Sequence, residues 1–563
     1  RMSAFITAMD QPLGRTVGYT YNVTGELTTA TDVTGQAMAM TYDGNHRLLT
    51  ITDANGHTFV RNVYDDRGRV SEQYDALNNK TLFAYDEPGH FTLVTDPLGR
   101  TTTYQYDAEW RLTSEKDPLN KTVAYTYDAD HNRIQVVDKR GYTMTLAYDD
   151  RGNPLVMTDT LGYTQVFVYD ARNNLLAATD KRGATTYYDY DANSNLLNVT
   201  DAFSGVTAWT YDVHGLAVSR SDPLGRVTLY GYDGYGYRRA ITDALGYATT
   251  FVYDVGGRRL SETDALGRVT SYTYDAANRL LTVSEPLGKL TQYVYDAVDN
   301  RTGITNARGA VTTFSYDEKD RLASVTDPLG RTTTYTYDAV DNQTAVTDPL
   351  GHTTSYAYDA LGRRTSVTDA LGHTMSYAYD ANGNRTKLTD ANGKVTQYSY
   401  DPLNRLAQVT DALGGVVSYT YDGNGNRVGM TDANGHVSTY TYDALDRLIA
   451  TTDPLGYTTS YTYDAAGNQV SQTRADGTVL TYSYDALNRL VAVAAPGLSV
   501  AYAFDGVGNR STMTDALGVT SYQYDALDQR TQVVSGTTTV QFAYDGDGVR
   551  LGKTLEIGRA SCR

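Results

Sequence analysis

The chain has 563 residues, a formal net charge of −18 and one cysteine, Cys562. A single cysteine excludes a disulfide framework within the chain. The basic residues are spread thinly, whereas binding to a phosphate backbone needs a basic stripe, so we expect no nucleic-acid partner. No 18-residue apolar run is present, so we also expect no membrane span.

A tyrosine-aspartate pair stands at Tyr42-Asp43 and then returns every 21 residues from Tyr64-Asp65 to Tyr484-Asp485, along almost the whole chain. Three 20-residue steps follow, at Phe504, Tyr524 and Tyr544. A fixed period of this length indicates an array of small structural units. We interpret residues 21–555 as the array and residues 1–20 as its degenerate or truncated start. We interpret residues 556–563 as a non-native tail, because they match a translated sequencing adapter and nothing in the repeat.

The repeat that begins at Tyr316 and Asp317 predicts two strands, over residues 321–326 and 331–337, which are rich in Thr, Val and Tyr. Between them, Asp327, Pro328 and Gly330 occupy the first, second and fourth positions of a type I β-turn. A second turn follows the Tyr-Asp pair, and in copies such as Asp359 to Arg363 and Asp275 to Arg279 its fourth position is Gly or Asn, where a positive φ is tolerated. Each repeat is therefore predicted to be one β-hairpin joined to the next.

Alternation along the second strand places Tyr335 and Tyr337 on one face and threonines on the other. In the first strand Leu322 and Val325 have opposite parity, which indicates either a bulge or a strand that uses both faces. Because neither face is strongly apolar, a sandwich with a dry core is not expected. We predict an all-β fold in which tandem 21-residue β-hairpin repeats form one long curved antiparallel ribbon, a spiral or partial hollow shell.

The repeated core Tyr-Asp-x-x-Gly/Asn-Arg-Leu, as in Tyr358 to Arg363 and Tyr484 to Leu490, resembles the YD repeat of Rhs proteins. Similar repeats occur in the C component of insecticidal toxin complexes and in teneurins. The resemblance implies a hairpin ribbon that forms a hollow shell, which in bacterial members encloses a C-terminal toxic domain. The core segment and self-cleavage site that follow the repeats in bacterial members are not found in this sequence.

The sequence contains few candidates for metal-binding or catalytic residues. The loop that begins at Asp422 alternates oxygen-bearing residues, but Arg427 and Ala433 stand where an EF-hand needs Gly and Glu. His352 and His373 occupy equivalent turns about 9–10 Å apart, too far to share a zinc ion. We therefore expect no metal, no cofactor and no catalytic residues, so the chain is not expected to be an enzyme.

Two functions remain open. The first is the structural shell of a secreted Rhs-type bacterial toxin, which encapsulates a C-terminal effector and helps to deliver it. In this hypothesis the partner is the toxin domain, and the protein is secreted or lies at the cell surface. The second is a module that binds cell-surface or cell-wall carbohydrate, because flat rings stack on sugars. Its candidate stacking residues are Tyr335, Tyr337, Tyr440 and Tyr442, whereas Tyr316, Asp317, Asp327, Pro328 and Gly330 are expected to be structural.

Overall fold

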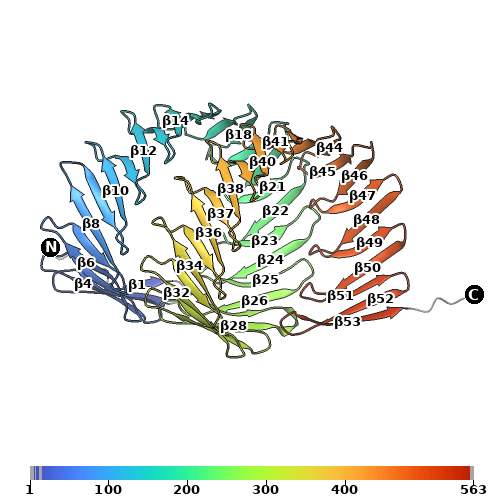
Figure 1. The fold of residues 1–563 in the computed structure, drawn as a ribbon. Helices are drawn as coiled ribbons and strands as arrows, with labels where there is room; N and C mark the ends of the chain where they lie inside the picture. Colours follow the sequence, from blue (N-terminus) through green and yellow to red (C-terminus); the bar gives the residue numbers. More distant parts are fainter. Residues whose placement is uncertain (1–5, 7, 12–14, 558–563) are drawn as a thin grey trace, which may run out of the picture. The chain divides into compact units, whose positions relative to one another are not determined.

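The computed structural model describes residues 6, 8–11 and 15–557, and over this part of the chain it contains one antiparallel sheet of 53 strands. Strands that follow one another in sequence are neighbours in the sheet, so the ribbon is a continuous meander of hairpins (Figure 1). The predicted all-β array of hairpin repeats is confirmed. A single 3-10 turn, η2 (Pro286–Gly288), interrupts it among the described residues.

Two kinds of strand alternate along the ribbon. The odd-numbered strands follow the Tyr-Asp turns and are mostly five residues long, and the even-numbered strands end at the tyrosine and have mostly six. The odd-numbered strands are β1 (Ala8–Gln11), β3 (Leu27–Thr31), β5 (Leu48–Thr52), β7 (Val70–Tyr74), β9 (Phe91–Thr95), β11 (Leu112–Lys116), β13 (Arg133–Val137), β15 (Pro154–Thr158), β17 (Leu175–Thr179), β19 (Leu196–Thr200), β21 (Ala217–Ser221), β23 (Arg238–Thr242), β25 (Arg259–Thr263), β27 (Leu280–Ser284), β29 (Arg301–Thr305), β31 (Leu322–Thr326), β33 (Gln343–Thr347), β35 (Arg364–Thr368), β37 (Arg385–Thr389), β39 (Leu406–Thr410), β41 (Arg427–Thr431), β43 (Leu448–Thr452), β45 (Gln469–Thr473), β47 (Leu490–Ala495), β49 (Arg510–Asp515), β51 (Arg530–Ser535) and β53 (Arg550–Ile557). The even-numbered strands are β2 (Arg15–Tyr21), β4 (Ala37–Tyr42), β6 (Thr58–Tyr64), β8 (Lys80–Asp86), β10 (Thr101–Tyr106), β12 (Thr122–Tyr127), β14 (Thr143–Tyr148), β16 (Thr164–Tyr169), β18 (Thr185–Tyr190), β20 (Val206–Tyr211), β22 (Val227–Tyr232), β24 (Ala248–Tyr253), β26 (Val269–Tyr274), β28 (Leu290–Tyr295), β30 (Val311–Tyr316), β32 (Thr332–Tyr337), β34 (Thr353–Tyr358), β36 (Thr374–Tyr379), β38 (Val395–Tyr400), β40 (Val416–Tyr421), β42 (Val437–Tyr442), β44 (Thr458–Tyr463), β46 (Val479–Tyr484), β48 (Leu498–Phe504), β50 (Gly518–Tyr524) and β52 (Thr538–Tyr544).

A β-bulge recurs just after the Tyr-Asp turn. Between β30 and β31, Tyr316 pairs with Leu322 and Ser315 with Ser324, so Ala323 has no partner of its own. An extra residue of this kind shifts the alternation of the strand and interrupts the hydrogen-bond ladder. The bulge therefore explains why Leu322 and Val325 can share a face, and it decides between the two interpretations that the sequence left open.

Departures from the 21-residue period are absorbed in two ways. The step from Tyr42 to Tyr64 has one extra residue, which the ladder accommodates at Phe59 because Ile51 pairs with Val60 and Thr52 with Thr58. The three 20-residue repeats instead shorten the loop: Ala495, Asp515 and Ser535 pair with residues three positions later and leave two-residue turns. The Tyr-Asp turn keeps its form in these repeats, whereas the turn after Tyr85 differs: Asp86 pairs with Phe91 and no bulge follows.

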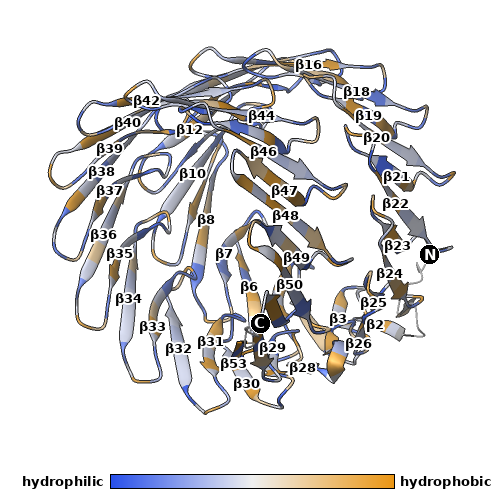
Figure 2. Ribbon diagram, turned by 90° about the vertical axis from the view of Figure 1, so that its right-hand side faces the viewer, coloured by the Kyte–Doolittle hydropathy of each residue, from blue (hydrophilic) through white to orange (hydrophobic). Residues whose placement is uncertain are grey.

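The sheet has no dry core, as the composition predicted. Among the described residues Leu480 is the one buried hydrophobic side chain, and Asn62 and Asp117 are the buried polar ones. Figure 2 shows apolar and polar residues mixed along the strands rather than gathered into an apolar layer. In β32 the tyrosines are half-buried whereas Thr334 and Thr336 are exposed, so the tyrosine face is the better covered one.

The chain forms two compact units. Unit 1 holds residues 1–145, 273–283 and 291–398, and unit 2 holds residues 146–272, 284–290 and 399–563. In each unit we call the lower-numbered ribbon segment the first segment (15–145 or 146–272) and the higher-numbered one the second segment (291–398 or 399–557). The two borders of the ribbon are named after their turns, the Tyr-Asp edge and the Asp-Pro edge.

No helix in the described part of the chain is long and apolar enough to cross a membrane. Strand β53 ends at Ile557, where Glu556 and Ile557 pair with Thr539 and Thr538 of β52. The remainder of the tail that the sequence set apart, including Cys562, lies outside the described residues.

Candidate functional site: turn clamps and the seam

The turn that follows each Tyr-Asp pair is held by its own aspartate. In the repeat at Tyr316, Asp317 Oδ1 accepts hydrogen bonds from the backbone N–H groups of Lys319 and Arg321 at 2.9 and 3.1 Å. Arg321 Nε donates to Asp317 Oδ2 at 2.8 Å. Burial alone would raise the pKa of the Asp317 carboxyl, but the hydrogen bonds from Arg321 outweigh it and hold this pKa below its ordinary value.

The same arginine joins its repeat to the next one. Arg321 Nη1 donates to the backbone carbonyl of Asp338 at 3.1 Å, and its guanidinium lies 4.6 Å from the ring centroid of Tyr337. The Tyr337 hydroxyl then donates to the carbonyl of Leu322 at 2.9 Å, beside the bulge. The cation–π contact and the charge-assisted hydrogen bonds both stabilise the packing of one repeat on the next. The Tyr-Asp pair therefore couples adjacent repeats.

The Asp-Pro turn is held by the same kind of hydrogen bonds from its own backbone to its aspartate. Asp327 Oδ1 accepts from the N–H groups of Leu329 and Arg331, and the Gly330 N–H donates to the Asp327 carbonyl at 2.9 Å. Gly330 has φ +78°, a conformation that a side chain would strain. The structure thus places Asp327, Pro328 and Gly330 in the turn that their sequence order predicted.

In unit 1 the Asp-Pro edge of the first segment contacts the Tyr-Asp edge of the second, and we call this line of contact the seam. Lys319 Nζ lies 2.7 Å from Asp75 Oδ2, and Arg100 Nη1 donates to the Asp359 carbonyl at 3.2 Å. Burial would raise the pKa of Asp75, but hydrogen bonds from Lys319 and Asn79 keep it below its ordinary value. Further seam contacts in unit 1 join Asn55 to Asp296, Arg140 to Asp380, and Asn382 to Asp138.

Unit 2 has a seam of the same construction. Arg226 Nη1 donates to the Asp485 carbonyl at 3.1 Å, and its Nη2 donates to Asn488 Oδ1 at 2.7 Å. Arg182 bonds to the Asp443 carbonyl and to the Asp446 carboxylate, both at 2.8 Å. Arg268 and Asp528 form a further pair at 2.9 Å. In each case a turn of one segment donates to a turn about 260 residues later in sequence.

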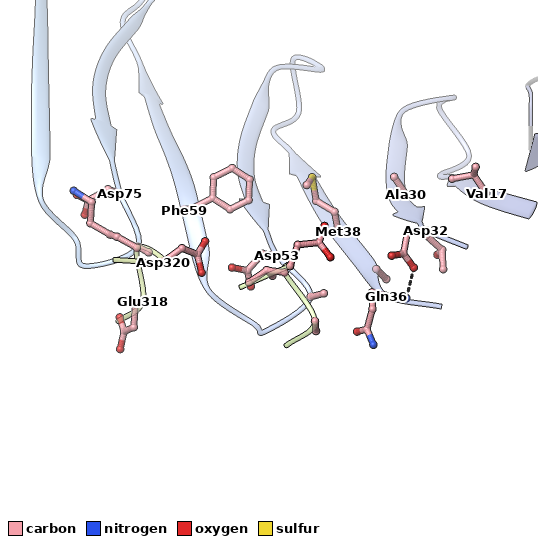
Figure 3. Close-up of a pocket in the computed structure, with 18 of the residues that line it drawn as sticks. Val17, Ala30, Asp32, Gln36, Met38, Asp53, Phe59, Asp75, Glu318 and Asp320 are labelled. Carbon is pink, nitrogen blue, oxygen red and sulfur yellow. Dashed lines mark hydrogen bonds and ion pairs between the residues drawn. The ribbon is translucent and has the colours of Figure 1, made fainter. Parts of the chain in front are cut away.

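A cavity of 660 Å³ lies along the seam of unit 1, between turns of both segments (Figure 3). Apolar side chains from β2, β4 and β6, including Val17, Met38 and Phe59, line one side. Acidic turn residues surround them, which are Asp32, Asp53, Asp75, Asp299, Glu318 and Asp320, with Lys319 beside them. The cavity therefore combines an apolar wall with a negatively charged rim.

The four tyrosines proposed for glycan stacking are half-buried and lie in β32 and β42. Tyr337 and Tyr442 use their hydroxyls to bond the carbonyls of Leu322 and Arg427. Arg427 also lies over the ring of Tyr440, 4.7 Å from its centroid. These contacts are structural, and carbohydrate binding at these tyrosines stays a prediction.

His352 and His373 bond within their own turns on the Asp-Pro edge. His352 Nδ1 lies 2.9 Å from Asp348 Oδ2, and His373 Nδ1 lies 2.9 Å from Asp369 Oδ2. Over the described residues, no group of three or more His, Cys, Asp or Glu side chains is arranged to hold a metal ion.

The seam residues were missed by the sequence interpretation, which treated every turn as equivalent. Arg100 and Arg226 follow Asp-Pro-Leu-Gly directly, as does Arg331. The motif was therefore visible, but the sequence does not state which copies lie against another segment. Lys319 carried no signal beyond its position in a Tyr-Asp turn.

Two family models match the sequence. The Teneurin YD-shell model matches residues 2–182 and 160–310. The RHS Repeat model matches residues 295–332, 316–353, 337–374, 379–416, 403–437, 421–458, 442–479, 463–500 and 504–540. The curated proteins contain no match to this sequence.

Solved structures share the fold. The crystal structure of TcdB2-TccC3 is 17% identical with a TM-score of 0.73, and the match covers 98% of this chain and 37% of that one. The Tc holotoxin pore of Photorhabdus luminescens is 14% identical with a TM-score of 0.71, and the match covers 94% of this chain and 39% of that one. A structure of TcdB2-TccC3 without its hypervariable C-terminal region is 15% identical with a TM-score of 0.62, covering 96% of this chain and 39% of that one. The chain thus spans well under half the length of the chains that it matches.

The hairpin meander, the turn clamps and the seam define a structural repeat protein. The Teneurin YD-shell model covers more than half of the sequence, and RHS Repeat matches continue from there to residue 540. The chain belongs to the YD-shell family of RHS-repeat proteins.

Proposed function

We propose that this chain is part of the wall of a secreted, Rhs-type bacterial toxin shell, which encapsulates a C-terminal effector and helps to deliver it. The observation that carries the proposal is the shared fold with TcdB2-TccC3 over 98% of the chain. That relative has a hypervariable C-terminal region. Another match is described as a holotoxin pore.

The construction of the ribbon supports a wall. A one-layer sheet with both faces partly wet gains little from burial, so its order depends on backbone ladders, turn clamps and repeat-to-repeat contacts. The seam adds hydrogen bonds and ion pairs between segments far apart in sequence. Such contacts close the border between two passes of ribbon, as a wall that separates two compartments requires.

The test begins with the gene. Reading the frame beyond Lys553 on an independent assembly should reveal further shell sequence followed by a compact domain that resembles a toxin. A stop codon or a wall anchor directly after the repeats would contradict the proposal.

The longer chain then allows a direct measurement of encapsulation. Limited proteolysis should leave the C-terminal domain intact in the native protein and degrade it once the shell is opened with urea. The same domain expressed alone is the control and should be cleaved at once. Equal cleavage in the native shell would contradict encapsulation.

Carbohydrate binding by the tyrosine face is the alternative. Its test is a glycan array probed with this chain, in which Tyr335→Ala should weaken any binding without loss of β-structure. Binding that survives substitution of Tyr335 and Tyr440 would exclude these rings as the site.

A further inference from the structure

The second segments contain an alternation that the 21-residue period conceals. The residue four positions after the aspartate of the Tyr-Asp turn is alternately Arg and Asn from repeat to repeat. Arginine stands at 321, 363, 405, 447 and 489, and asparagine stands at 300, 342, 384, 426, 468 and 509; the last two repeats depart from the alternation, with Gln529 and Val549. The true period of this stretch is therefore two repeats.

Where the residue is arginine, its guanidinium donates a hydrogen bond to the backbone carbonyl of the aspartate in the next turn. Arg447 Nη1 donates to the Asp464 carbonyl at 3.0 Å, and Arg489 Nη1 to the Asp505 carbonyl at 3.2 Å. The asparagine side chain is too short to reach the carbonyl of the next turn. Asn468 Nδ2 instead bonds to Asp464 Oδ2 within its own turn, at 2.9 Å, and to the side-chain oxygen of Asn488 in the next turn, at 2.5 Å, without reaching the Asp485 carbonyl.

The arginines that cross the seam go to the carbonyls that follow an asparagine repeat. In unit 2, Arg226 reaches the Asp485 carbonyl after Asn468, and Arg182 reaches the Asp443 carbonyl after Asn426. Arg268 approaches the Asp525 carbonyl after Asn509 at 3.5 Å. In unit 1, Arg100 reaches the Asp359 carbonyl after Asn342 in the same way.

Carbonyls that already accept an arginine of their own segment do not accept one from across the seam. Arg182 also lies near the turn at Asp422, whose carbonyl already accepts from Arg405 at 2.7 Å, and there it meets only the carboxylate, at 3.3 Å. In unit 1, Arg140 likewise meets the Asp380 carboxylate, while Arg363 holds the Asp380 carbonyl.

We propose that Asn342, Asn426, Asn468 and Asn509 are positioning residues that set the register of the seam. The carbonyl that follows each of them accepts the N–H of its own turn but no arginine of its own segment, so it has room for an arginine from the first segment. Identical repeats specify register weakly, and a single polar substitution can fix it, as in coiled coils. A slip by one repeat would bring Arg226 opposite a carbonyl that Arg447 or Arg489 already occupies. The Arg226 side chain is 14% exposed, so it would be left poorly solvated and beside another cation. This inference concerns how the ribbon is held and does not depend on what it encloses.

The decisive variant is Asn468→Arg, made in the full chain and followed by hydrogen exchange of the turn at residues 485–488. The introduced guanidinium should take the Asp485 carbonyl and displace Arg226. A charge-assisted hydrogen bond of 1.5–3 kcal/mol corresponds to a roughly tenfold or greater increase in exchange at this turn.

Asn174→Arg is the matched control. Asn174 has the same bond to its own turn aspartate, Asp170 Oδ2 at 2.9 Å, but it lies on the Tyr-Asp edge of the first segment, away from the seam. Its substitution should change exchange at the seam less than about threefold. Equal acceleration by the two variants would overturn the proposal.

A second background keeps the test valid if the single variant folds poorly. In a chain that already carries Arg226→Ala, Asn468→Arg removes no seam bond and should add no further acceleration. Additive effects of the two substitutions would show that Asn468 does not act through Arg226, and the proposal would then be wrong.

Discussion

The hydroxyl of Tyr337 donates a hydrogen bond to the backbone carbonyl of Leu322, fifteen residues earlier, at 2.9 Å. The acceptor lies at the bulge, where the ladder between strands is interrupted. The same bond recurs from Tyr295 to Leu280 and from Tyr463 to Leu448. The bond gives a reason for tyrosine to recur at a position where phenylalanine would fill the same space.

Removing this hydroxyl tests the bond. Tyr337→Phe leaves the Leu322 carbonyl without its donor, and we expect a local loss of about 1 kcal/mol. Hydrogen exchange of β31 and β32 should accelerate severalfold while distant repeats are unchanged, because repeat arrays respond locally.

The chain supplies the reverse experiment at Phe504, which stands where other repeats have tyrosine and packs under Arg489 at 4.8 Å. Phe504→Tyr should form the missing bond to the Leu490 carbonyl and slow exchange around β47 and β48. If Tyr337→Phe and Phe504→Tyr both leave exchange unaltered, the hydroxyl contributes nothing.

Stability should fall in acid. The pKa values of the turn carboxyls Asp317, Asp222 and Asp485 lie below their ordinary value because hydrogen bonds from the turn arginine outweigh the opposing effect of burial. Their contribution is complete above the unfolded pKa of about 3.9 and is lost as the pH falls through the folded values.

Urea unfolding followed by circular dichroism at pH 6, 4 and 3 checks this expectation. The midpoint should decrease mainly below pH 4, although acid also relieves repulsion among charges that sum to −18 at neutral pH. We expect the turn bonds to dominate because they act at contact distance. A midpoint that rises as the pH falls would show that charge repulsion dominates instead.

Asp117 and Lys139 form the most buried ion pair of the turns, at 2.8 Å, with the Asp117 side chain 3% exposed. Lys139→Met leaves this carboxylate buried and unpaired, which should cost about 3 kcal/mol. Thermal unfolding of the variant should show a reduced midpoint for the part that contains β11 and β13.

Two further variants separate charge from packing at this pair. Adding Asp117→Asn to Lys139→Met removes the buried charge while keeping the oxygen that accepts from Leu119 and Lys121, so it should recover most of the loss. Lys116→Met, at an exposed lysine in β11, should have no measurable effect. A loss that the double variant does not recover would assign the effect to packing of the Lys139 stem.

Arg226 and Arg331 allow the seam to be tested with the same motif in two settings. Both follow Asp-Pro-Leu-Gly, but the Arg226 side chain is 14% exposed and bonds across the seam, whereas that of Arg331 is 62% exposed and bonds to Asp327 alone among the described residues. Arg226→Ala should destabilise the seam of unit 2 by about 1.5–3 kcal/mol. Arg331→Ala should change stability by less than about 0.5 kcal/mol.

Proteolysis of native protein at residues 485–488 measures this difference, since opening of the seam exposes the turn. Equal sensitivity in the two variants would mean that the contacts across the seam do not hold it closed.

Local chemistry made the hairpin predictable. The order of Asp327, Pro328 and Gly330 specifies a turn whatever surrounds it, and the alternation around Tyr335 and Tyr337 specifies a strand. The bulge at Ala323 was predicted only in part. The opposite parity of Leu322 and Val325 indicated an irregularity in the strand but did not locate it. The extra residue at Phe59 and the two-residue turns after Ala495 were not foreseen, since a strand ladder and a loop can each absorb a change of one residue.

The sequence by itself determined the repeat, its two turns, its strands and the absence of a dry core, because these depend on contacts within about 21 residues. Only the tertiary structure decided which turns meet. The Asp-Pro-Leu-Gly-Arg turns at Arg226 and Arg331 are alike in sequence, yet one arginine bonds across the seam and the other remains in solvent. That difference arises from the return of the ribbon alongside itself about 260 residues later, a distance over which no local pattern carries information.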